Sequence, residues 1–342
     1  MRLLNYALII IAGLVLTSCS EKKQTPFAKD WQVFAQRFYE DGRIVDTGND
    51  GISHSEGQGY GMLFAAVAGD KTRFDELWRW TRVTLQRDDG LFSWRYRPCP
   101  EYSAACVDDP NNASDGDVLI AWALYRAAQV WGSQTYRQQA ITILNAIEDK
   151  LIVTRQGQPL LLPGEAGFMN DDGLQLNLSY WIFPAFSDFY ALTNQPVWQQ
   201  LSEQGQILLK QARWGNWKLP ADWVSYKDGE LHLQNTLHTD YGYNACRIPL
   251  HVVWQKQFDN SLLSSFLNFY DQQAVPATVD VKNGNTADHS WSKGMATVAD
   301  VVAYRAGKSV RKPQIMLGDE QDYYSASLIM LSQLALMDTE SP

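Results

Sequence analysis

The acidic residues of this chain that could do chemistry lie in polar stretches just ahead of apolar runs. Glu56 lies in the stretch 54–62, Asp115 and Asp117 precede a second apolar run, and Asp240 precedes a third. Separated carboxylates suit hydrolysis, in which one carboxylic acid protonates a leaving oxygen and another carboxylate activates water. The chain contains no G-x-S-x-G nucleophile elbow and no P-loop.

Three glycines follow Glu56 at alternate positions. Gly57, Gly59 and Gly61 are each poorer helix formers than alanine by about 1 kcal/mol, yet they lead into an apolar, helix-like run. Glycine permits the close approach of another backbone or of a ligand. The alternative is a plain helix start, with Ser55 as the cap and Glu56 as the acidic residue of the first turn. The residues alone leave both interpretations open.

The Asp-Gly-Asp sequence at 115–117 also has a plain interpretation. An isolated instance is typical of helix caps and turns. Calcium binding is another interpretation, but no EF-hand loop is present. The chain has five His and no metal-ligand spacing, so we predict neither a metal nor another cofactor.

Composition favours a sugar-binding protein over a nucleic-acid-binding one. The 342 residues are 45% hydrophobic, enough for one large or two small domains. The formal net charge is -9 and no Lys/Arg cluster is present, so nucleic acid is a poor partner. The 13 Trp, 16 Tyr and 13 Phe residues suit a groove that stacks on flat, hydroxylated ligands such as sugars.

The N-terminus has the pattern of a signal peptide. The apolar run 6–16 is shorter than the roughly 20 residues that a stable membrane span needs. Residues 16–19 resemble the bacterial lipobox, in which Cys19 is lipidated after cleavage. We expect a lipoprotein-type signal peptide over 1–18 and a tether over 19–26. The protein is then exported to the periplasm and held at the outer membrane only by its lipid anchor. An ordinary signal peptide with an incidental Cys is the alternative.

Three further cysteines are present. Cys99 and Cys106 bracket a short polar segment, and an oxidising compartment favours a disulfide between them. Cys246 lies in an apolar helical run and is predicted to be a buried thiol.

Apolar residues recur at helical spacing through most of the chain. Residues 118–128 are almost continuously apolar, as expected of a buried helix. The other predicted helices are 31–39, the Glu56 helix, 71–86, 133–153, 178–193, 196–214, 243–256, 259–273, 292–307 and 320–337. Strand signal is confined to short pieces such as 160–162 and 230–234. Roughly eleven helices without strand–helix alternation predict an all-α, α/α architecture.

Several segments resemble glycoside hydrolase family 8. Residues 113–124 (ASDGDVLIAWAL) look like the signature of that family, and 55–62 (SEGQGYGM) resembles its proton-donor motif. Further blocks match in the same order at 161–164, 177–180 and 243–248. The similarity covers residues 27–338, which we expect to form one domain. It is strongest to the periplasmic endoglucanases of bacterial cellulose-synthesis operons.

The resemblance implies an (α/α)6 barrel and an inverting endo-hydrolase of β-1,4-glucan. Glu56 would be the general acid, and Asp115 would hold the sugar ring at the cleavage point. The resemblance also implies a set of cleft residues: Asp117, Trp94, Tyr180, Tyr243, Asn244 and Arg247, the last of which would orient groups at the cleft floor. The partners implied are β-1,4-glucan and the machinery of cellulose synthesis and export.

One position departs from the family pattern. Members that act on cellulose usually carry an Asp as general base where this chain has Asn244. An amide can position a water but cannot take its proton. Asp240 is the nearest replacement by sequence, Asp222 and Glu230 are weaker candidates, and Asp115 could also serve.

Three interpretations of function remain. The first is an endo-β-1,4-glucanase that trims glucan during cellulose export. The second keeps the fold but acts on chitosan, mixed-linkage glucan or xylan. The third is a glucan-binding protein in which Asn244 marks lost catalysis. Intact Glu56 and Asp115 favour an enzyme, because a protein that only binds glucan has little need of a buried acid.

Overall fold

A computed structural model of the chain describes residues 24–99, 106–170, 173–234, 239–318 and 321–340. The predicted signal peptide, Cys19 and most of the predicted tether lie outside these ranges. Eleven α-helices dominate the described residues, and their strands are only two to four residues long. No helix in these ranges combines the length and apolar character needed to cross a membrane. The predicted all-α class is confirmed.

The helices follow the predicted order with shifted ends. They are α1 (Pro26–Phe38), α2 (Ser55–Ala68), α3 (Lys71–Thr84), α4 (Ser114–Trp131), α5 (Gln134–Lys150), α6 (Phe183–Thr193), α7 (Val197–Gln211), α8 (Ile248–Val253), α9 (Ser264–Tyr270), α10 (Lys293–Arg305) and α11 (Tyr323–Glu340). Short 3₁₀ helices, η2 (Leu178–Tyr180), η3 (Ala245–Arg247) and η4 (Asn260–Leu263), precede α6, α8 and α9.

The predicted helices 178–193 and 243–256 are therefore each broken in two. Pro184 and Pro249 lie in the first turns of α6 and α8. A proline has no N–H to donate to the preceding turn but fits the start of a helix, where the N–H groups have no partner within the helix. Each α-helix consequently begins anew at its proline.

The strands form small antiparallel sheets between the helices. They are β1 (Tyr39–Glu40), β2 (Arg43–Ile44), β3 (Ser53–His54), β4 (Ser93–Tyr96), β5 (Asp109–Asn112), β6 (Ile152–Arg155), β7 (Gln158–Leu161), β8 (Met169–Asn170), β9 (Gly173–Leu176), β10 (Val224–Lys227), β11 (Glu230–Leu233), β12 (Asp240–Tyr241) and β13 (Val279–Asp280). The sheets are β1-β2, β3-β4-β5, β6-β7, β8-β9-β10-β11 and β12-β13. Because β3 leads into α2 and β5 leads into α4, one sheet supports the starts of both helices.

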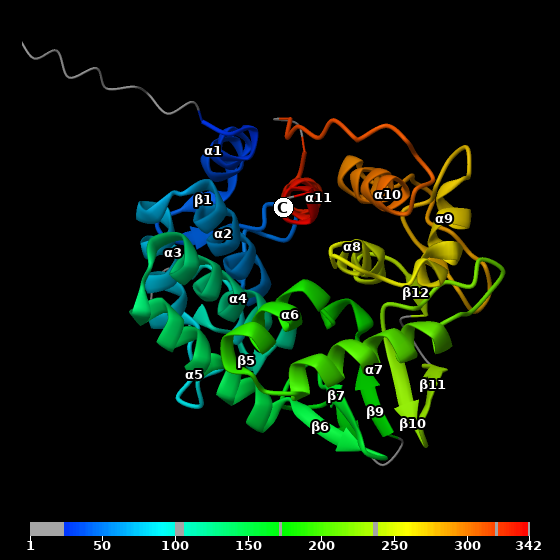
Figure 1. Ribbon diagram of the computed structural model, residues 1–342, viewed down its shortest axis with the longest axis horizontal. Coiled ribbons are helices and arrows are strands. Elements are labelled where there is room, and N and C mark those ends of the chain that lie inside the picture. Colours follow the sequence, from blue (N-terminus) through cyan, green and yellow to red (C-terminus); the bar gives the residue numbers. More distant parts are fainter. Residues whose placement is uncertain (1–23, 100–105, 171–172, 235–238, 319–320, 341–342) are drawn as a thin grey trace, which may run out of the picture.

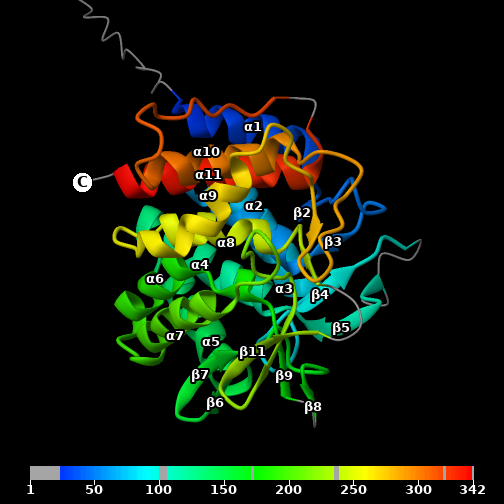
Figure 2. The same ribbon diagram turned by 90° about the vertical axis from the view of Figure 1, so that its right-hand side faces the viewer.

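The helices alternate between an outer and an inner layer. Successive members of the inner ring, α2, α4, α6, α8, α10 and α11, contact one another, and α1 contacts both α11 and α2. The helices α1, α3, α5, α7 and α9 lie outside this ring, and the non-helical segment 306–318 takes the place of a sixth outer helix (Figure 1). The helix α11 contacts both α1 and α10, and the three run in similar directions in Figure 2. This arrangement is the expected (α/α)6 barrel.

The glycines after Glu56 let α2 pack closely against its neighbours. A Cβ on Gly59 would lie 2.5 Å from Leu119 Cβ and 3.2 Å from Ile120 N of α4. A Cβ on Gly61 would lie 2.5 Å from Ile44 Cγ1. These positions therefore allow a close approach of α2 to other parts of the protein.

The cap of α2 differs from the prediction. His54 rather than Ser55 is the N-cap, and its Nδ1 accepts a hydrogen bond from Gly57 N at 3.0 Å. Ser55 is already helical and its side chain is buried against α4. A buried residue on the inner face of the helix cannot turn back to cap the first N–H groups.

Candidate active site

Glu56 reaches the solvent from the first turn of α2. Its side chain is 21% exposed, and its Oε1 forms an ion pair with Arg247 Nη1. Tyr60 also donates a hydrogen bond to Oε1, at 3.1 Å. Tyr60 lies four residues after Glu56 and therefore on the same face of the helix. Both contacts hold one carboxylate oxygen, which leaves Oε2 directed away from them.

Arg247 connects segments that are far apart in the sequence. From η3 its guanidinium donates to Tyr60 Oη at 3.0 Å, to Asn244 Oδ1 at 2.9 Å and to Ser179 Oγ at 3.3 Å. Arg247 is buried, and burial lowers the pKa of its guanidinium. A buried cation with several fixed acceptors is held in one orientation. Arg247 thus fixes Glu56 relative to Asn244.

Asp115 lies in the first turn of α4, close to the start of α2. Its carboxylate is buried and accepts a hydrogen bond from Gly116 N at 2.8 Å. Burial raises the pKa of Asp115 to about 6, although the Gly116 N–H and the nearby charge of His54 act in the opposite direction. An acid with this pKa is ionised at neutral pH and can accept hydrogen bonds from sugar hydroxyls.

Asp117 does not line the cleft, contrary to the prediction. It is fully buried, and its two oxygens accept hydrogen bonds from Phe92 N at 2.9 Å and from Asn112 Nδ2 at 2.6 Å. These bonds connect the start of α4 to β5 and to the residue before β4. Burial raises the pKa of Asp117 to about 7, with the nearby charge of Asp115 adding to the rise. The role of this residue in the fold is structural.

The carboxylate of Asp222 contacts the turn that carries Asn244. Its Oδ1 accepts hydrogen bonds from Gly242 N at 3.0 Å and from Ala245 N at 2.7 Å. Burial raises the pKa of Asp222 to about 6, while the N–H groups of Ala245, Gly242 and Asn244 act to lower it. A Cβ on Gly242 would lie 2.9 Å from Asp222 Oδ2, so the glycine makes room for the carboxylate.

The two other candidates for a base are less well placed. Asp240 is exposed on β12, where it pairs with Asp280, and the alternation of the strand buries the next residue, Tyr241, instead. The carbonyl oxygen of Asp240 accepts a hydrogen bond from Asp222 N at 2.7 Å. Glu230 is exposed at the end of the β10-β11 hairpin, opposite Lys227. The weaker candidate from the sequence, Asp222, is therefore the one next to Asn244.

Aromatic rings line the space around these carboxylates. Burial raises the pKa of Tyr180 well above its usual range, and the charges of Asp115 and Asp222 add to the rise, which places Tyr180 near both. Trp223 meets Tyr180 edge to face, with ring centres 6.2 Å apart. Phe168 stacks on Trp223 at 5.9 Å with ring planes only 4° apart. Half-buried rings in this arrangement can support the faces of sugar rings.

The side chains of Tyr243 and Trp94 have partners outside the Glu56–Arg247 group. Tyr243 is 46% exposed, and its hydroxyl is 3.2 Å from His289 Nε2. Trp94 is on β4, where its indole N–H donates to Asp109 at 2.7 Å and Arg95 covers its ring at 4.6 Å. Neither side chain bonds to the Glu56–Arg247 group, so their predicted contact with substrate stays a prediction.

The sequence contained signals for some of the residues that it did not single out. Tyr60 lies at helical spacing from Glu56, and Ser179 lies in a block already matched to the family. Phe168 and Trp223 carried no signal beyond being aromatic residues in loops. Phe168 and Trp223 are far apart in the sequence and come together only in the folded chain.

Two of the cysteines are bridged and a third is a free thiol. Cys99 and Cys106 form a disulfide, with Cα atoms 5.6 Å apart. Cys246 is a buried free thiol, 3.0 Å from the hydroxyl of Tyr324. Within the part of the chain that the structure describes, no group of three His, Cys, Asp or Glu residues could hold a metal ion.

The chain is similar to known glycoside hydrolases. The family model described as glycosyl hydrolases family 8 matches residues 4–338. An endoglucanase of Cellulomonas uda is 38% identical over 297 residues, which cover 85% of this chain and 82% of the relative.

Two solved structures are also similar. One is endoglucanase Cel10, a family 8 glycosyl hydrolase from Klebsiella pneumoniae, with a TM-score of 0.83 and 38% identity over 91% of this chain and 100% of that one. The other is the endo-beta-1,4-glucanase CMCax from Acetobacter xylinum, with a TM-score of 0.82 and 34% identity over 92% of this chain and 99% of that one.

Proposed function

The chain belongs to glycosyl hydrolases family 8, and we infer that it is an endoglucanase that hydrolyses cellulose-type β-1,4-glucan. The endoglucanase relatives at 34–38% identity, which match this chain over most of its length, support this activity. The observation that carries the mechanism is the series of contacts from Glu56 through Arg247 and Asn244 to Asp222.

We propose that Glu56 is the general acid. Arg247 and Tyr60 both hold Oε1, whereas Oε2 has only His54 Nδ1 at 3.9 Å, beyond hydrogen-bond distance, so Oε2 is the oxygen that carries a proton to the leaving glycosidic oxygen. The partial exposure of the side chain allows a glucan chain to reach it. As the leaving oxygen takes the proton, the carboxylate that remains is stabilised by the cationic guanidinium of Arg247.

We propose Asp222 as the general base, in place of Asp240. The contacts that link Asp222 to Glu56 run through Asn244 and then the guanidinium of Arg247, which sets the two carboxyl groups apart. An inverting mechanism needs such a gap, roughly 6.5–9.5 Å, to hold the attacking water. Asn244 then positions that water and Asp222 accepts its proton. A base with a pKa of about 6 is ionised at neutral pH and still takes up a proton readily.

Asp115 has a positioning role in this proposal. Its buried carboxylate lies at the start of α4, near Tyr180 and beside the start of α2. There it can accept hydrogen bonds from hydroxyls of the sugar ring at the cleavage point. Such bonds hold the ring in the geometry that the reaction requires.

The test is the release of reducing ends from carboxymethylcellulose by the wild-type protein and by Glu56→Gln. We expect the wild type to be active. The rate of the variant should be lower by about 10²–10⁴-fold, the usual contribution of a general acid. Glu203→Gln is the matched control, because Glu203 is exposed on α7. NMR of the first products should show inversion of the anomeric centre. Full activity in Glu56→Gln would contradict the assignment of the acid.

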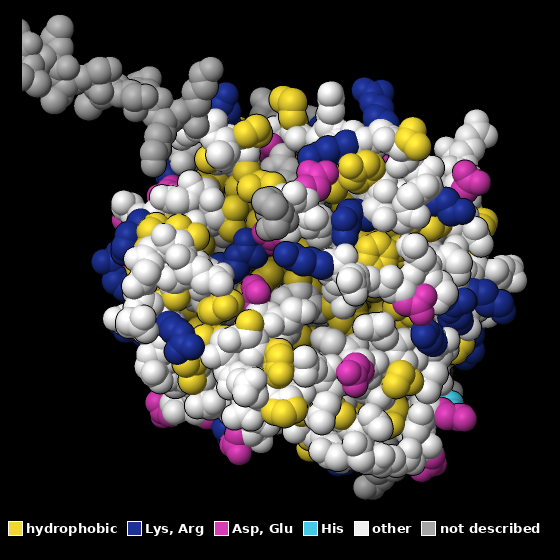
Figure 3. All heavy atoms as spheres, viewed as in Figure 1, with side chains coloured by type: hydrophobic (Ala, Val, Ile, Leu, Met, Phe, Trp, Pro, Cys, Tyr) yellow, Lys and Arg dark blue, Asp and Glu magenta, His cyan; other side chains and the backbone are white. Residues whose placement is uncertain are grey.

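A glucan-binding protein without catalysis is the second candidate. Asn244 favours it, because the usual base is absent at that position. Calorimetric binding of cello-oligosaccharides without product after long incubation would support it. For chitosan, a cationic polymer, a strongly acidic surface would be expected, but the face in Figure 3 carries basic and acidic side chains interspersed.

We further propose that the protein acts in the periplasm as an outer-membrane lipoprotein linked to cellulose synthesis. The signal-peptide pattern of 1–18 and the lipobox-like residues 16–19 support export and lipidation of Cys19. Incorporation of labelled palmitate into the wild type, and its loss in Cys19→Ser, is the expected result. Residues 27–338 would form the catalytic domain, carried on the tether 19–26.

A further inference from the structure

A small cavity lies between two loops outside the Glu56–Arg247 group. It measures about 140 Å³ and is enclosed by residues 214–219, after α7, and residues 279–284, around β13. It shares no lining residue with the candidate active site. It is nevertheless attached to the wall of that site, because Asp222 follows Leu219 by three residues and β13 pairs with β12.

Both loops are held in fixed conformations. Trp214 and Leu219 exchange backbone hydrogen bonds of 3.0 and 3.1 Å across a tight turn. Asp280 accepts hydrogen bonds from Thr239 Oγ1 at 2.7 Å and from Lys282 N at 2.8 Å. The two loops also interlock, because a Cβ on Gly215 would lie 2.5 Å from Val281 O. The cavity is therefore preformed rather than created by moving loops.

The side chains at the cavity carry polar groups without protein partners. Trp214 and Trp217 are partly exposed, and Asn216 and Lys282 are exposed. Within the described ranges, no hydrogen bond or ion pair to the protein is formed by four of these polar groups. They are the indole N–H groups of Trp214 and Trp217, the amide of Asn216 and the ammonium of Lys282. Trp217 is held edge to face against Phe269 at 5.6 Å. Fixed aromatic rings beside free donors are the features by which proteins recognise sugars.

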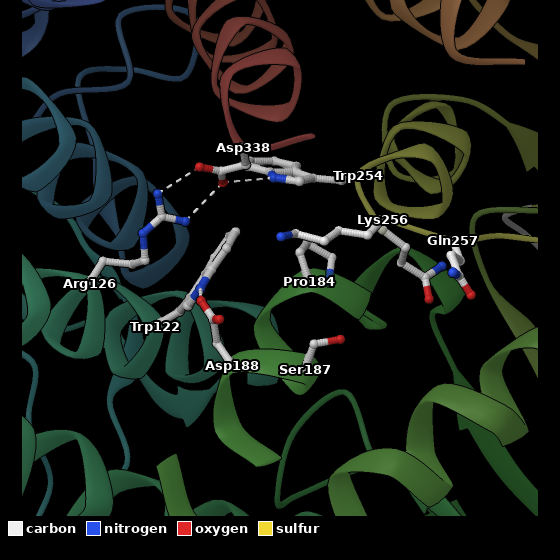
Figure 4. A pocket seen from close by; sticks show the side chains of 10 residues that line it. Trp122, Arg126, Pro184, Ser187, Asp188, Trp254, Lys256, Gln257 and Asp338 are labelled. Atoms are coloured by element: carbon white, nitrogen blue, oxygen red, sulfur yellow. Dashed lines mark hydrogen bonds and ion pairs between the residues drawn. The ribbon is translucent and has the colours of Figure 1, made fainter. Parts of the chain in front are cut away.

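A larger cavity lies between α4, α6, α11 and the residues that follow α8 (Figure 4). It measures about 530 Å³, but, apart from Lys256 and Gln257, the polar side chains on its wall are hydrogen-bonded within the described part of the protein. Trp122 donates to Asp188 at 2.6 Å, and Asp338 accepts from Trp254 at 2.9 Å and twice from Arg126 at 2.8 Å. Both of these Trp side chains are buried. This network stabilises the end of the barrel and leaves few groups for a ligand.

We propose that the cavity between residues 214–219 and 279–284 is a second carbohydrate-binding site, which holds one glucosyl residue of a β-glucan outside the cleft. The proposal rests on the inferred endoglucanase function for the identity of the sugar. The small volume suits a single ring rather than a length of chain. Because the site is attached to the wall that carries Asp222, it would keep the enzyme on a glucan while another segment occupies the cleft.

The experiment counts binding sites for cellotriose by titration calorimetry, with the full chain carrying Glu56→Gln so that bound sugar is not cleaved. We expect two sites per chain in this background and one after the further change Trp217→Ala. Asn216→Ala should weaken the second site about tenfold, the value of one good hydrogen bond. Asn145→Ala, an exposed Asn on α5, is the matched control and should leave both sites unchanged.

The outcomes separate this proposal from the inferred function. If Glu56→Gln protein binds one cellotriose with an affinity that Asn216→Ala and Trp217→Ala do not alter, the second site is overturned while the cleft stands. If no cellotriose binds and the wild type does not cleave glucan, the inferred function fails as well. Should Trp217→Ala prove unfolded by circular dichroism, Trp217→Phe, which keeps a ring but removes the N–H, and Asn216→Ala decide the matter.

Discussion

Gly116 of α4 lies directly against Ser55 at the start of α2. A Cβ on Gly116 would lie 2.6 Å from Ser55 Cβ and 2.9 Å from the backbone N of Glu56. The two helices therefore meet at their first turns, where Glu56 and Asp115 are located. The glycine between Asp115 and Asp117 is what allows the general acid and the sugar-positioning carboxylate of the proposed mechanism to lie side by side.

Gly116→Ala should consequently impair both stability and activity. The added methyl has a backbone atom in its way and cannot be accommodated by rotating a side chain. We expect a loss of about 1–3 kcal/mol in the free energy of unfolding, the usual cost of overpacking, together with a lower kcat because Glu56 is displaced. Urea unfolding and initial rates on carboxymethylcellulose measure the two effects. Gly48→Ala is the control, because a Cβ there meets only Asp46 Oδ1 at 3.5 Å.

Asp222→Asn should abolish hydrolysis, whereas Asp240→Asn should retain it. The two substitutions make the same chemical change at two residues that are joined by a backbone hydrogen bond. The carboxylate of Asp222 is tied to the Asn244 turn by two backbone N–H groups. Loss of a general base lowers kcat by about 10²–10⁴-fold. The measurement is kcat on a soluble cello-oligosaccharide, with circular dichroism to verify folding. The reverse pattern, with Asp240→Asn inactive, would restore the assignment made from the sequence.

The sequence predicted Glu56 and Asp115 because each lies in a continuous motif at the start of a helix. Asp117 was misplaced because of helix geometry. Residues two apart project about 200° from one another, so Asp115 and Asp117 cannot both face the cleft. Asp240 is exposed on β12 while Tyr241 is buried, because neighbouring residues of a strand face opposite sides. The misplacement of Asp117 arises from treating neighbours in sequence as neighbours in the site.

The position of Asp222 next to Asn244, which favours it over the other candidate bases, can be seen only in the folded chain. It lies just ahead of β10, and its proximity to Asn244 depends on backbone hydrogen bonds to a turn twenty residues later. The helix order, in contrast, could be predicted because each helix carries its own apolar periodicity. Most of the short strands could not be predicted, because each is defined by its pairing with another segment and not by a pattern in its own few residues.

Activity should fall at acidic pH with an apparent pKa near 6. The proposed base Asp222 has a pKa raised to about 6 by burial and must be ionised to take a proton from water. Asp115, also with a pKa of about 6, must be ionised to accept hydrogen bonds from the sugar. The acidic limb of kcat/KM therefore belongs to both groups together. A profile that stays flat from pH 7 down to about pH 4.5 would contradict these roles, and Glu203→Gln should reproduce the wild-type profile.

Stability should decrease as the pH rises from about 4 to 7. The pKa of the buried Asp117 is raised from 3.8 to about 7 in the folded protein, so the folded state holds this proton more tightly than the unfolded state. Its contribution is therefore fully present below the unfolded pKa and is lost as the pH rises through the folded pKa. The buried carboxyl groups of Asp115 and Asp222, whose pKa values are also raised, change the stability in the same direction.

Urea unfolding at several pH values measures this effect as the slope of the free energy of unfolding against pH, rather than as its value at one pH. Asp117→Asn removes the titrating group but also presents an amide to Asn112 Nδ2, so it should lower stability at every pH. Its slope between pH 5 and pH 7 should nevertheless be flatter than that of the wild type. Asp149→Asn, on the exposed side of α5, should keep the wild-type slope. Equal slopes in Asp117→Asn and wild type would mean that Asp117 is already ionised in the folded protein at pH 5.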